Sequence, residues 1–242
     1  MKKITFLLIL SFCCSTAFSQ WERTTGPEGS SIEFLTNIDG KIYAGTNGDG
    51  VFQSTNAGSN WIPLNTGMEY ENVRSVVLKS GDLFAGSFQN GVFKSTNGGE
   101  SWIPPAPENR FKVYDLLVKD NYIFAGSQGL YRSSDNGNTW ELSPYIFQFA
   151  QTSICSSGEN IFVASYGDME KSTDNGDTFT KQFQFESQAI FSLYSLDSMV
   201  FVGSSNKIYR SVDHGENFEQ INIPFPFSIV NIYDFAYVGS TL

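Results

Sequence analysis

Hydrophobic residues along this chain occur in short runs separated by turns rich in Gly, Asn, Asp and Ser. One run recurs: two apolar residues, one of them usually aromatic, followed by small residues. It stands at 42–46, 83–87, 123–127, 161–165 and 200–204. Short apolar runs bounded by turn residues predict β-strands rather than helices. We therefore expect the same strand five times.

Further strands are predicted on both sides of this run. Another short apolar segment follows it at 50–53, 91–94, 129–132 and 207–210, and a longer one precedes it, for example at 73–78 and 113–118. Adding the strand expected after the next turn gives four strands in each repeat of about 40 residues. That pattern predicts the blades of a β-propeller, an all-β fold of four-stranded antiparallel sheets.

An eight-residue motif, which we call the box, lies between the third and fourth predicted strands. It begins with Ser and carries Asn or Asp at its third position, Gly at its fifth and Trp or Phe at its eighth. Its residues are Ser54, Asn56, Gly58, Trp61, Ser95, Asn97, Gly99, Trp102, Ser133, Asp135, Gly137, Trp140, Ser172, Asp174, Gly176, Phe179, Ser211, Asp213, Gly215 and Phe218. The five serines are 41, 38, 39 and 39 residues apart.

The box resembles the Asp-box, or bacterial neuraminidase, repeat of sialidases, sortilin-type propellers, some endoglucanases and photosystem II assembly factor-like proteins. The resemblance covers nearly all of the chain after residue 20 and implies a hairpin turn. In such a turn the Asp side chain accepts backbone N–H bonds, Gly supplies a positive φ, and the aromatic residue packs between blades. Asn in the first two boxes can accept the same bonds. We therefore assign the boxes a structural role.

The two ends of the chain predict an incomplete ring. Trp21–Gly26 resembles Trp61–Gly67, the strand after a box, so a blade's outermost strand is expected there. Residues 229–234 and 237–240 repeat the first and second strands, and no sixth box follows. We expect five box blades, a partial sixth, and a single propeller domain over 20–242 that is truncated at its C-terminus.

The first residues are typical of a cleavable signal peptide. Met1–Lys3 is basic, 4–12 is apolar, and Ala17-Phe18-Ser19 fits a cleavage site. A membrane anchor would need roughly 20 apolar residues. We predict a signal peptide over 1–19, with cleavage near Ser19/Gln20 and a secreted or cell-surface protein.

Charge and cysteine content narrow the classes of partner. Removing 1–19 changes the formal charge from −10 to −12, which disfavours nucleic acid and anionic lipid. Cys155 would remain alone, so the mature domain contains no internal disulfide, and we expect this thiol to be buried. A single histidine, His214, cannot define a transition-metal site, and no cofactor motif is present.

The sequence shows no complete set of catalytic residues for a glycosidase. A sialidase needs three arginines to hold the substrate carboxylate. The five arginines after residue 20 include Arg23, but Arg132 and Arg210 precede box serines and are interpreted as repeat residues, and we take only Arg74 and Arg110 as candidates. Other glycosidases need two facing carboxylates, and no spacing links two acids here.

The loops expected opposite the boxes carry aromatic and basic side chains, which suit contact with sugar or peptide. The candidate binding residues are Tyr70, Phe88, Arg110, Phe111, Tyr145 and Tyr166. We predict a secreted, non-catalytic propeller that binds glycan or protein through these loops. The alternative is an extracellular glycoside hydrolase, sialidase-like or endoglucanase-like, with active-site residues partly beyond Leu242.

Overall fold

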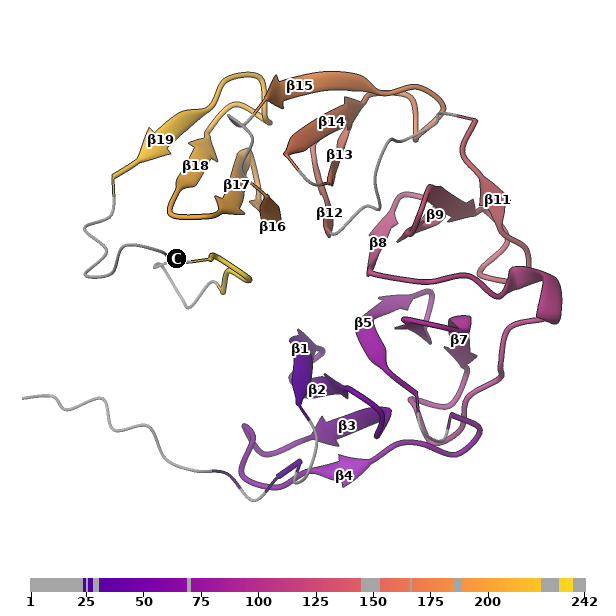
Figure 1. The fold of residues 1–242 in the computed structure, drawn as a ribbon. Coiled ribbons are helices and arrows are strands. Elements are labelled where there is room, and N and C mark those ends of the chain that lie inside the picture. The colour runs from indigo at the N-terminus through magenta and orange to yellow at the C-terminus, as the bar shows by residue number, and fades with distance from the viewer. Residues whose placement is uncertain are drawn as a thin grey trace, which may run out of the picture.

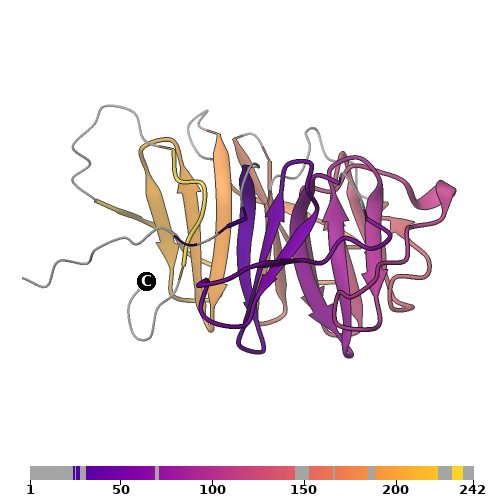
Figure 2. The same ribbon diagram turned by 90° about the horizontal axis from the view of Figure 1, so that it is seen from below.

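The computed structural model describes residues 24, 26–27, 31–68, 71–144, 153–165, 167–184, 189–222 and 231–236. Their strands form five antiparallel sheets arranged as blades around a central axis (Figure 1). Seen from the side, the strands run from one face of the disc to the other and the loops gather at the two faces (Figure 2). The predicted all-β propeller is confirmed.

Each blade is an antiparallel meander whose first strand lies nearest the axis. Blades 1 and 2 contain β1 (Ile32–Ile38), β2 (Lys41–Thr46), β3 (Val51–Ser54) and β4 (Ile62–Pro63), then β5 (Val73–Lys79), β6 (Asp82–Ser87) and β7 (Gly91–Ser95). Blade 3 contains β8 (Asp115–Lys119), β9 (Tyr122–Gly126), β10 (Leu130–Ser133) and β11 (Glu141–Leu142). Blade 4 contains β12 (Ser153–Ser157), β13 (Asn160–Ala164), β14 (Asp168–Ser172) and β15 (Thr180–Gln184). Blade 5 contains β16 (Ile190–Leu196), β17 (Met199–Ser204), β18 (Ile208–Ser211) and β19 (Glu219–Ile221).

Blade 2 departs from this plan at its outer edge. Its sheet has three strands, and the expected fourth is reduced to an isolated bridge between Lys94 and Ile103. Pro104 and Pro105 follow directly, and proline cannot donate the N–H that a sheet ladder needs. The chain then forms the short 3-10 helix η1 (Pro107–Asn109), which projects from the outer rim (Figure 1).

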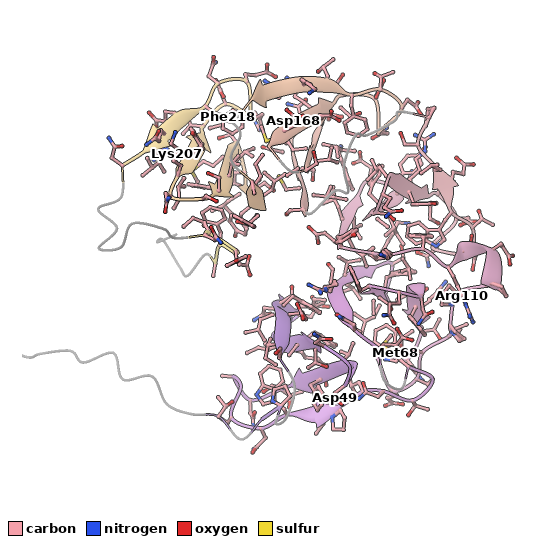
Figure 3. All side chains as sticks on the ribbon, viewed as in Figure 1. Asp49, Met68, Arg110, Asp168, Lys207 and Phe218 are labelled. Carbon is pink, nitrogen blue, oxygen red and sulfur yellow. The ribbon has the colours of Figure 1, made fainter. Side chains whose placement is uncertain are left out.

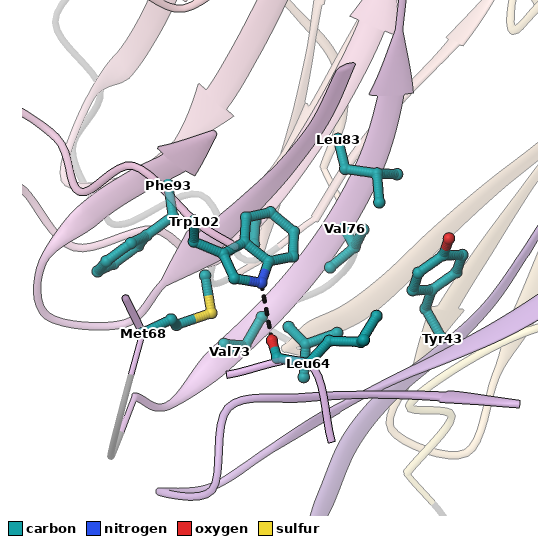
Figure 4. Close-up of a cluster of buried hydrophobic side chains, with 10 residues drawn as sticks. Tyr43, Leu64, Met68, Val73, Val76, Leu83, Phe93 and Trp102 are labelled. Carbon is teal, nitrogen blue, oxygen red and sulfur yellow. Dashed lines mark hydrogen bonds between the residues drawn. The ribbon is translucent and has the colours of Figure 1, made fainter. Parts of the chain in front are cut away.

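The core lies mainly between blades. Trp102, from the second box, is 4% exposed, and its Nε1 donates a 2.8 Å hydrogen bond to the carbonyl oxygen of Leu64, which follows blade 1 (Figure 4). Tyr43 of blade 1 and Val76 of blade 2 belong to the same buried cluster. Burying large aromatic and aliphatic groups between neighbouring sheets is what holds the blades in a ring.

Box glycines pack against the second strand of the preceding blade. Gly137 lies over Phe84, and a Cβ placed on it would be 2.5 Å from the phenylalanine ring. Gly215 lies over Phe162 in the same way, with a corresponding distance of 2.2 Å. Since the same glycines have φ near +80°, they are needed both for the turn and for this close approach.

Residues 231–236 contact blade 5 as the start of one blade contacts the blade before it. Ile232 N–H donates to the Ser204 carbonyl oxygen at 3.3 Å, as Val113 N–H, at the start of blade 3, donates to Ser87 at 3.0 Å. In Figure 1 the segment lies inside the ring, between β16 and β1. The described residues therefore form five blades and a segment that adds an isolated bridge at Asn231, and the partial sixth blade stays a prediction. The signal peptide over 1–19 and the truncation of the domain stay predictions, because the residues concerned lie outside the described part.

Candidate functional site

The five box turns share one set of hydrogen bonds. Each box Ser Oγ accepts the N–H of the box Gly at 2.8–2.9 Å and donates to Oδ1 of the box Asn or Asp at 2.6–3.0 Å. That Oδ1 also accepts the N–H of the residue four positions later at 2.9–3.0 Å. The polar side chains of the boxes thus bind their own turn.

These hydrogen bonds change the acidity of the box aspartates. Burial acts to raise the pKa of Asp135, but hydrogen bonds from Thr139 and Ser133 outweigh it and hold this pKa below its usual value. Hydrogen bonds from Ser211 and Asn217 lower the pKa of Asp213. A carboxylate stabilised in its ionised form is a poor general acid. The geometry is that of turn-forming residues.

The box aromatic residues lie against the inter-blade core to different depths. Trp102 and Phe179 are 4% and 5% exposed. Trp61, Trp140 and Phe218 are half-buried. The aromatic side chain is therefore buried most deeply between blades in the second and fourth boxes.

The residue before the second, third and fourth box serines connects neighbouring blades. Lys94 Nζ donates to the carbonyl oxygen of Asn136 in the next box turn at 3.1 Å, and Arg132 donates to that of Asn175 at 3.0 Å. Arg132 also forms an ion pair with Asp177 at 2.6 Å. Arg210, at the equivalent position of blade 5, pairs with Glu219 of its own blade.

The box turns and the turns between first and second strands lie at one face of the disc. His214 N–H, in the fifth box, donates to the carbonyl oxygen of Ser198, and Asn136 Nδ2 donates to Asp82 Oδ2 at 2.7 Å. The other loops lie at the opposite end of each antiparallel strand. We call that side the loop face; its described loops are 47–50, 64–68, 71–72, 88–90, 104–114, 127–129, 143–144 and 205–207.

The candidate binding residues fall into three groups. Tyr70, Tyr145 and Tyr166 lie outside the described residues. Phe111 is half-buried and stacks on Tyr131 with ring centroids 3.9 Å apart, so it belongs to the packing of blade 3. Phe88 and Arg110 lie on the loop face near blade 2, Phe88 half-buried and Arg110 exposed.

A groove of about 310 Å³ opens on the loop face at blade 2. Its lining comes from three loops and from β7, and consists of Gly67, Met68, Glu71, Asn90, Phe93, Pro104, Pro105 and Arg110. Figure 3 labels Met68 and Arg110 beside this blade. The site that the structure assembles around Arg110 is therefore a mainly polar groove, to which Pro104 and Pro105 add apolar surface.

Hydrogen bonds fix the rim and the loops of the groove. Glu71 accepts a hydrogen bond from Ser87 Oγ at 2.5 Å and one from Asn90 Nδ2 at 2.8 Å. Trp102 N–H donates to the carbonyl oxygen of Thr66 at 2.8 Å, which ties the loop after blade 1 to blade 2. A groove fixed in this way loses little conformational entropy when a ligand binds.

A second cavity, of about 660 Å³, lies along the axis between the innermost strands. Asp115 on its wall accepts the N–H of Ile154, from the next blade, at 2.9 Å and the N–H of Leu116 at 2.8 Å. Burial raises the pKa of Asp115 to about 6, against the lowering effect of these bonds and of bonds from Ser75 and Ser153. Asp115 therefore links blades 3 and 4 around the axis.

The other reactive side chains in the described part are buried or hydrogen-bonded within the fold. Burial raises the pKa of the Cys155 thiol to about 12, and the residue is 5% exposed. His214 Nδ1 lies 2.9 Å from Ser157 Oγ, at the box face. Among the described residues there is no cluster of three His, Cys, Asp or Glu side chains suited to a metal ion, and none of their helices is long and apolar enough to cross a membrane.

Sequence reasoning missed three residues. Glu71 and Asn90 stand in loops without any repeat pattern, so nothing in the sequence indicates that they meet. The repeat does contain a signal for Asp115. This residue occupies the first-strand position that holds Ser75 in blade 2 and Ser192 in blade 5, and each of the three pairs with a glycine of the second strand.

No protein-family description and no curated protein matches this sequence. Solved structures do resemble its fold. The GH74 enzyme of Niastella koreensis superposes with a TM-score of 0.67 at 18% identity, over 79% of this chain and 37% of that one. The extracellular domain of the putative one-component system BT4673 from B. thetaiotaomicron gives 0.67 at 19% identity, over 84% and 29%.

The GH74 xyloglucanase of Xanthomonas campestris also has a TM-score of 0.67, at 15% identity over 84% of this chain and 39% of its own. The chain thus spans well under half the length of each of these three structures. At this level of identity the likeness shows the propeller fold alone.

Proposed function

We propose that this protein is an extracellular propeller that binds a glycan through the groove on the loop face of blade 2, without cleaving it. The groove itself carries the proposal. It combines polar side chains with apolar surface from two prolines, and its volume is at the lower end of the range of small-ligand sites, roughly 300–1,000 Å³.

The polar groups match the chemistry of a sugar. Glu71 accepts hydrogen bonds, Arg110 donates them, and the Asn90 amide does both, which suits hydroxyl groups that donate and accept. Pro104 and Pro105, exposed and half-buried, supply apolar surface against which the C–H face of a sugar ring can rest. The Asp-box resemblance and the predicted signal peptide support an extracellular role of this kind.

The structural neighbours support the same class of function. Two of them are GH74 enzymes, one named a xyloglucanase, and another is an extracellular domain of a putative one-component system. Both kinds of protein are consistent with a propeller exposed to glycans outside the cell.

A glycoside hydrolase is the second candidate, favoured by the GH74 neighbours. Acid–base hydrolysis of a glycosidic bond uses two carboxyl groups on opposite sides of the bond. Among the described residues that line the groove, Glu71 is the only carboxylate, and two hydrogen bonds already hold it. We therefore favour binding over turnover.

The test is a glycan array with the secreted protein, followed by titration calorimetry on the best oligosaccharide and an assay for its cleavage. We expect binding without product, and a loss of roughly five- to tenfold in affinity for Asn90→Ala, because the groove loses a hydrogen bond worth on the order of 1–1.5 kcal/mol.

Lys41→Ala, an exposed change at the box face, is the matched control and should leave affinity unchanged. Release of shorter oligosaccharides would establish the hydrolase instead. Affinity that Asn90→Ala leaves intact would remove the groove from the proposal.

A further inference from the structure

Two cations on the loop face near the groove have no acidic partner among the described residues. Arg110 and Lys112 are exposed, and the structure shows no ion pair for either among the described residues. By contrast Lys94, Arg132 and Lys171 each pair with a carboxylate at 2.6–3.2 Å. Free cations are unexpected in a chain whose 25 acidic residues outnumber 15 basic ones.

Arg74 and Lys112 both lie over the ring of Phe88. The Arg74 guanidinium carbon lies 5.0 Å and Lys112 Nζ 5.3 Å from the centre of its ring. Tyr114 packs edge-on against the same ring at 5.5 Å and fixes it. Cation–π contacts offset part of the mutual repulsion of the two cations but add no negative charge beside them.

One carboxylate faces this group. Glu33 Oε2 lies 2.8 Å from an Arg74 terminal nitrogen, while Arg74 Nε is buried without a hydrogen-bond partner in the described structure. The pairing with Glu33 leaves the Lys112 ammonium as the uncompensated charge over Phe88.

The backbone directs the remaining cation to the same side. Arg110 is extended, with φ −89° and ψ 107°, and alternate residues of an extended chain point the same way. Phe111 turns inward onto Tyr131, so Arg110 and Lys112 project together. Arg110 also lines the groove, which connects the cations to the proposed sugar site.

We propose that Arg110 and Lys112, here named the cation strip, bind an anionic substituent of the glycan held in the groove, a carboxylate or a sulfate. This inference rests on the proposed function. The strip is the place on the loop face where free cations lie next to a built groove. The negative charge of the rest of the chain is screened beyond about 10 Å at 0.1 M salt, so it does not prevent local binding.

The experiment compares three oligosaccharides of equal length by calorimetry at about 0.05 and 0.3 M NaCl: a neutral cello-oligosaccharide, an oligogalacturonate and a sulfated cello-oligosaccharide. We expect at least one anionic probe to bind about tenfold more tightly than the neutral one at low salt, since hydrogen bonds to charged groups are stronger than those between neutral groups. The preference should shrink at high salt. The two anionic probes distinguish carboxylate from sulfate.

Lys112→Gln, outside the groove lining, should reduce the anionic preference and leave neutral binding within about twofold. Arg110→Gln should reduce anionic binding more than neutral binding, because Arg110 also lines the groove, and Lys41→Gln should change neither. Equal affinity for neutral and anionic probes overturns this inference and leaves the proposed function intact. Binding of none of the three probes overturns both. An anionic preference that survives both strip variants also overturns the inference, because it would assign the anion to other residues.

Discussion

Blades 2 and 3 come from the same repeat and differ at their outer edges. In blade 3, β11 pairs with β10 at two positions, and Ser143 N–H extends the ladder to the Leu130 carbonyl oxygen at 2.8 Å. In blade 2 the pairing stops at Lys94 and Ile103, and the residue equivalent to Ser143 is Pro105, which has no N–H. The groove opens where the prolines end the fourth strand.

The box turns form the scaffold in both blades, whereas the outer edge and the irregular loops form the candidate site. Both blades keep the same box hydrogen bonds, although the second box uses Asn97 and the third Asp135. The loops and the outer strand, where the repeat is least regular, carry the groove and the cation strip. Four predictions break or sharpen this comparison, starting with the largest effect.

The two box turns should respond very differently to an added methyl group. Gly137→Ala in blade 3 combines φ +80° with a Cβ 2.5 Å from Phe84, whereas Gly98→Ala in blade 2 has φ +73° and open space around the Cβ. We expect a loss of unfolding free energy of about 3 kcal/mol or more for the first and about 1 kcal/mol for the second. Urea unfolding measures both. Equal losses would show that Phe84 yields without cost.

The inner strands differ at one equivalent position, Ser75 in blade 2 and Asp115 in blade 3. Because the pKa of Asp115 is raised from 3.8 to about 6, the folded state binds more protons than the unfolded state in that window, and the contribution of Asp115 to stability falls as pH rises. Comparing Asp115→Asn with the parent protein, the variant should gain up to about 2–3 kcal/mol in relative stability between pH 4 and pH 7.

Urea unfolding at several pH values gives this difference directly, and other carboxylates cancel in the comparison. A difference between variant and parent that does not change with pH would contradict the raised pKa.

Restoring an N–H at the outer edge should make blade 2 resemble blade 1, where Leu64 N–H donates to the Val51 carbonyl oxygen at 2.8 Å. Pro105→Leu allows the same bond to Val92. The gain of about 1 kcal/mol is partly offset by the added freedom of the unfolded chain. We expect little net change in stability, slowed hydrogen exchange at residue 105, and weaker glycan binding. Fast exchange at this amide would mean that the outer strand does not form.

The smallest effect concerns the box side chains. Thr139 Oγ1 donates to Asp135 Oδ2 at 2.7 Å, whereas Asn97 Nδ2 donates to Ser101 Oγ, so the direction of the bond is reversed. Since the pKa of Asp135 is lowered, its contribution to stability is present above its ordinary pKa and is lost as pH falls through the lowered value.

Asp135→Asn should remove that acid sensitivity at a cost below about 1 kcal/mol at neutral pH, because the turn is exposed. Thermal unfolding between pH 2 and 7 measures this acid sensitivity. The control is Asn97→Ala, which removes the side-chain acceptor of the second box at every pH, because Asn97 does not ionise. An unchanged acid profile for Asp135→Asn would contradict the lowered pKa.

The sequence predicted the fold because the repeat makes local and global preferences agree. Alternating apolar strands, boxes at near-constant spacing and glycines at turns all indicate the same blade, and five copies reinforce one another. The position of the loop face also followed from the boxes, since strand direction alone determines it. Phe88 and Arg110 were therefore assigned to the correct side of the disc.

The site itself depended on tertiary structure. The sequence contains Pro104 and Pro105, but only the packed ring shows that they open a groove beside Met68, and that Glu71 meets Ser87 and Asn90 across two loops. Phe111, an aromatic residue like Phe88, turned out to pack on Tyr131. Repeated residues are determined by short-range patterns that a sequence displays. Residues that act once are placed by the path of irregular loops, which contacts with neighbouring blades decide.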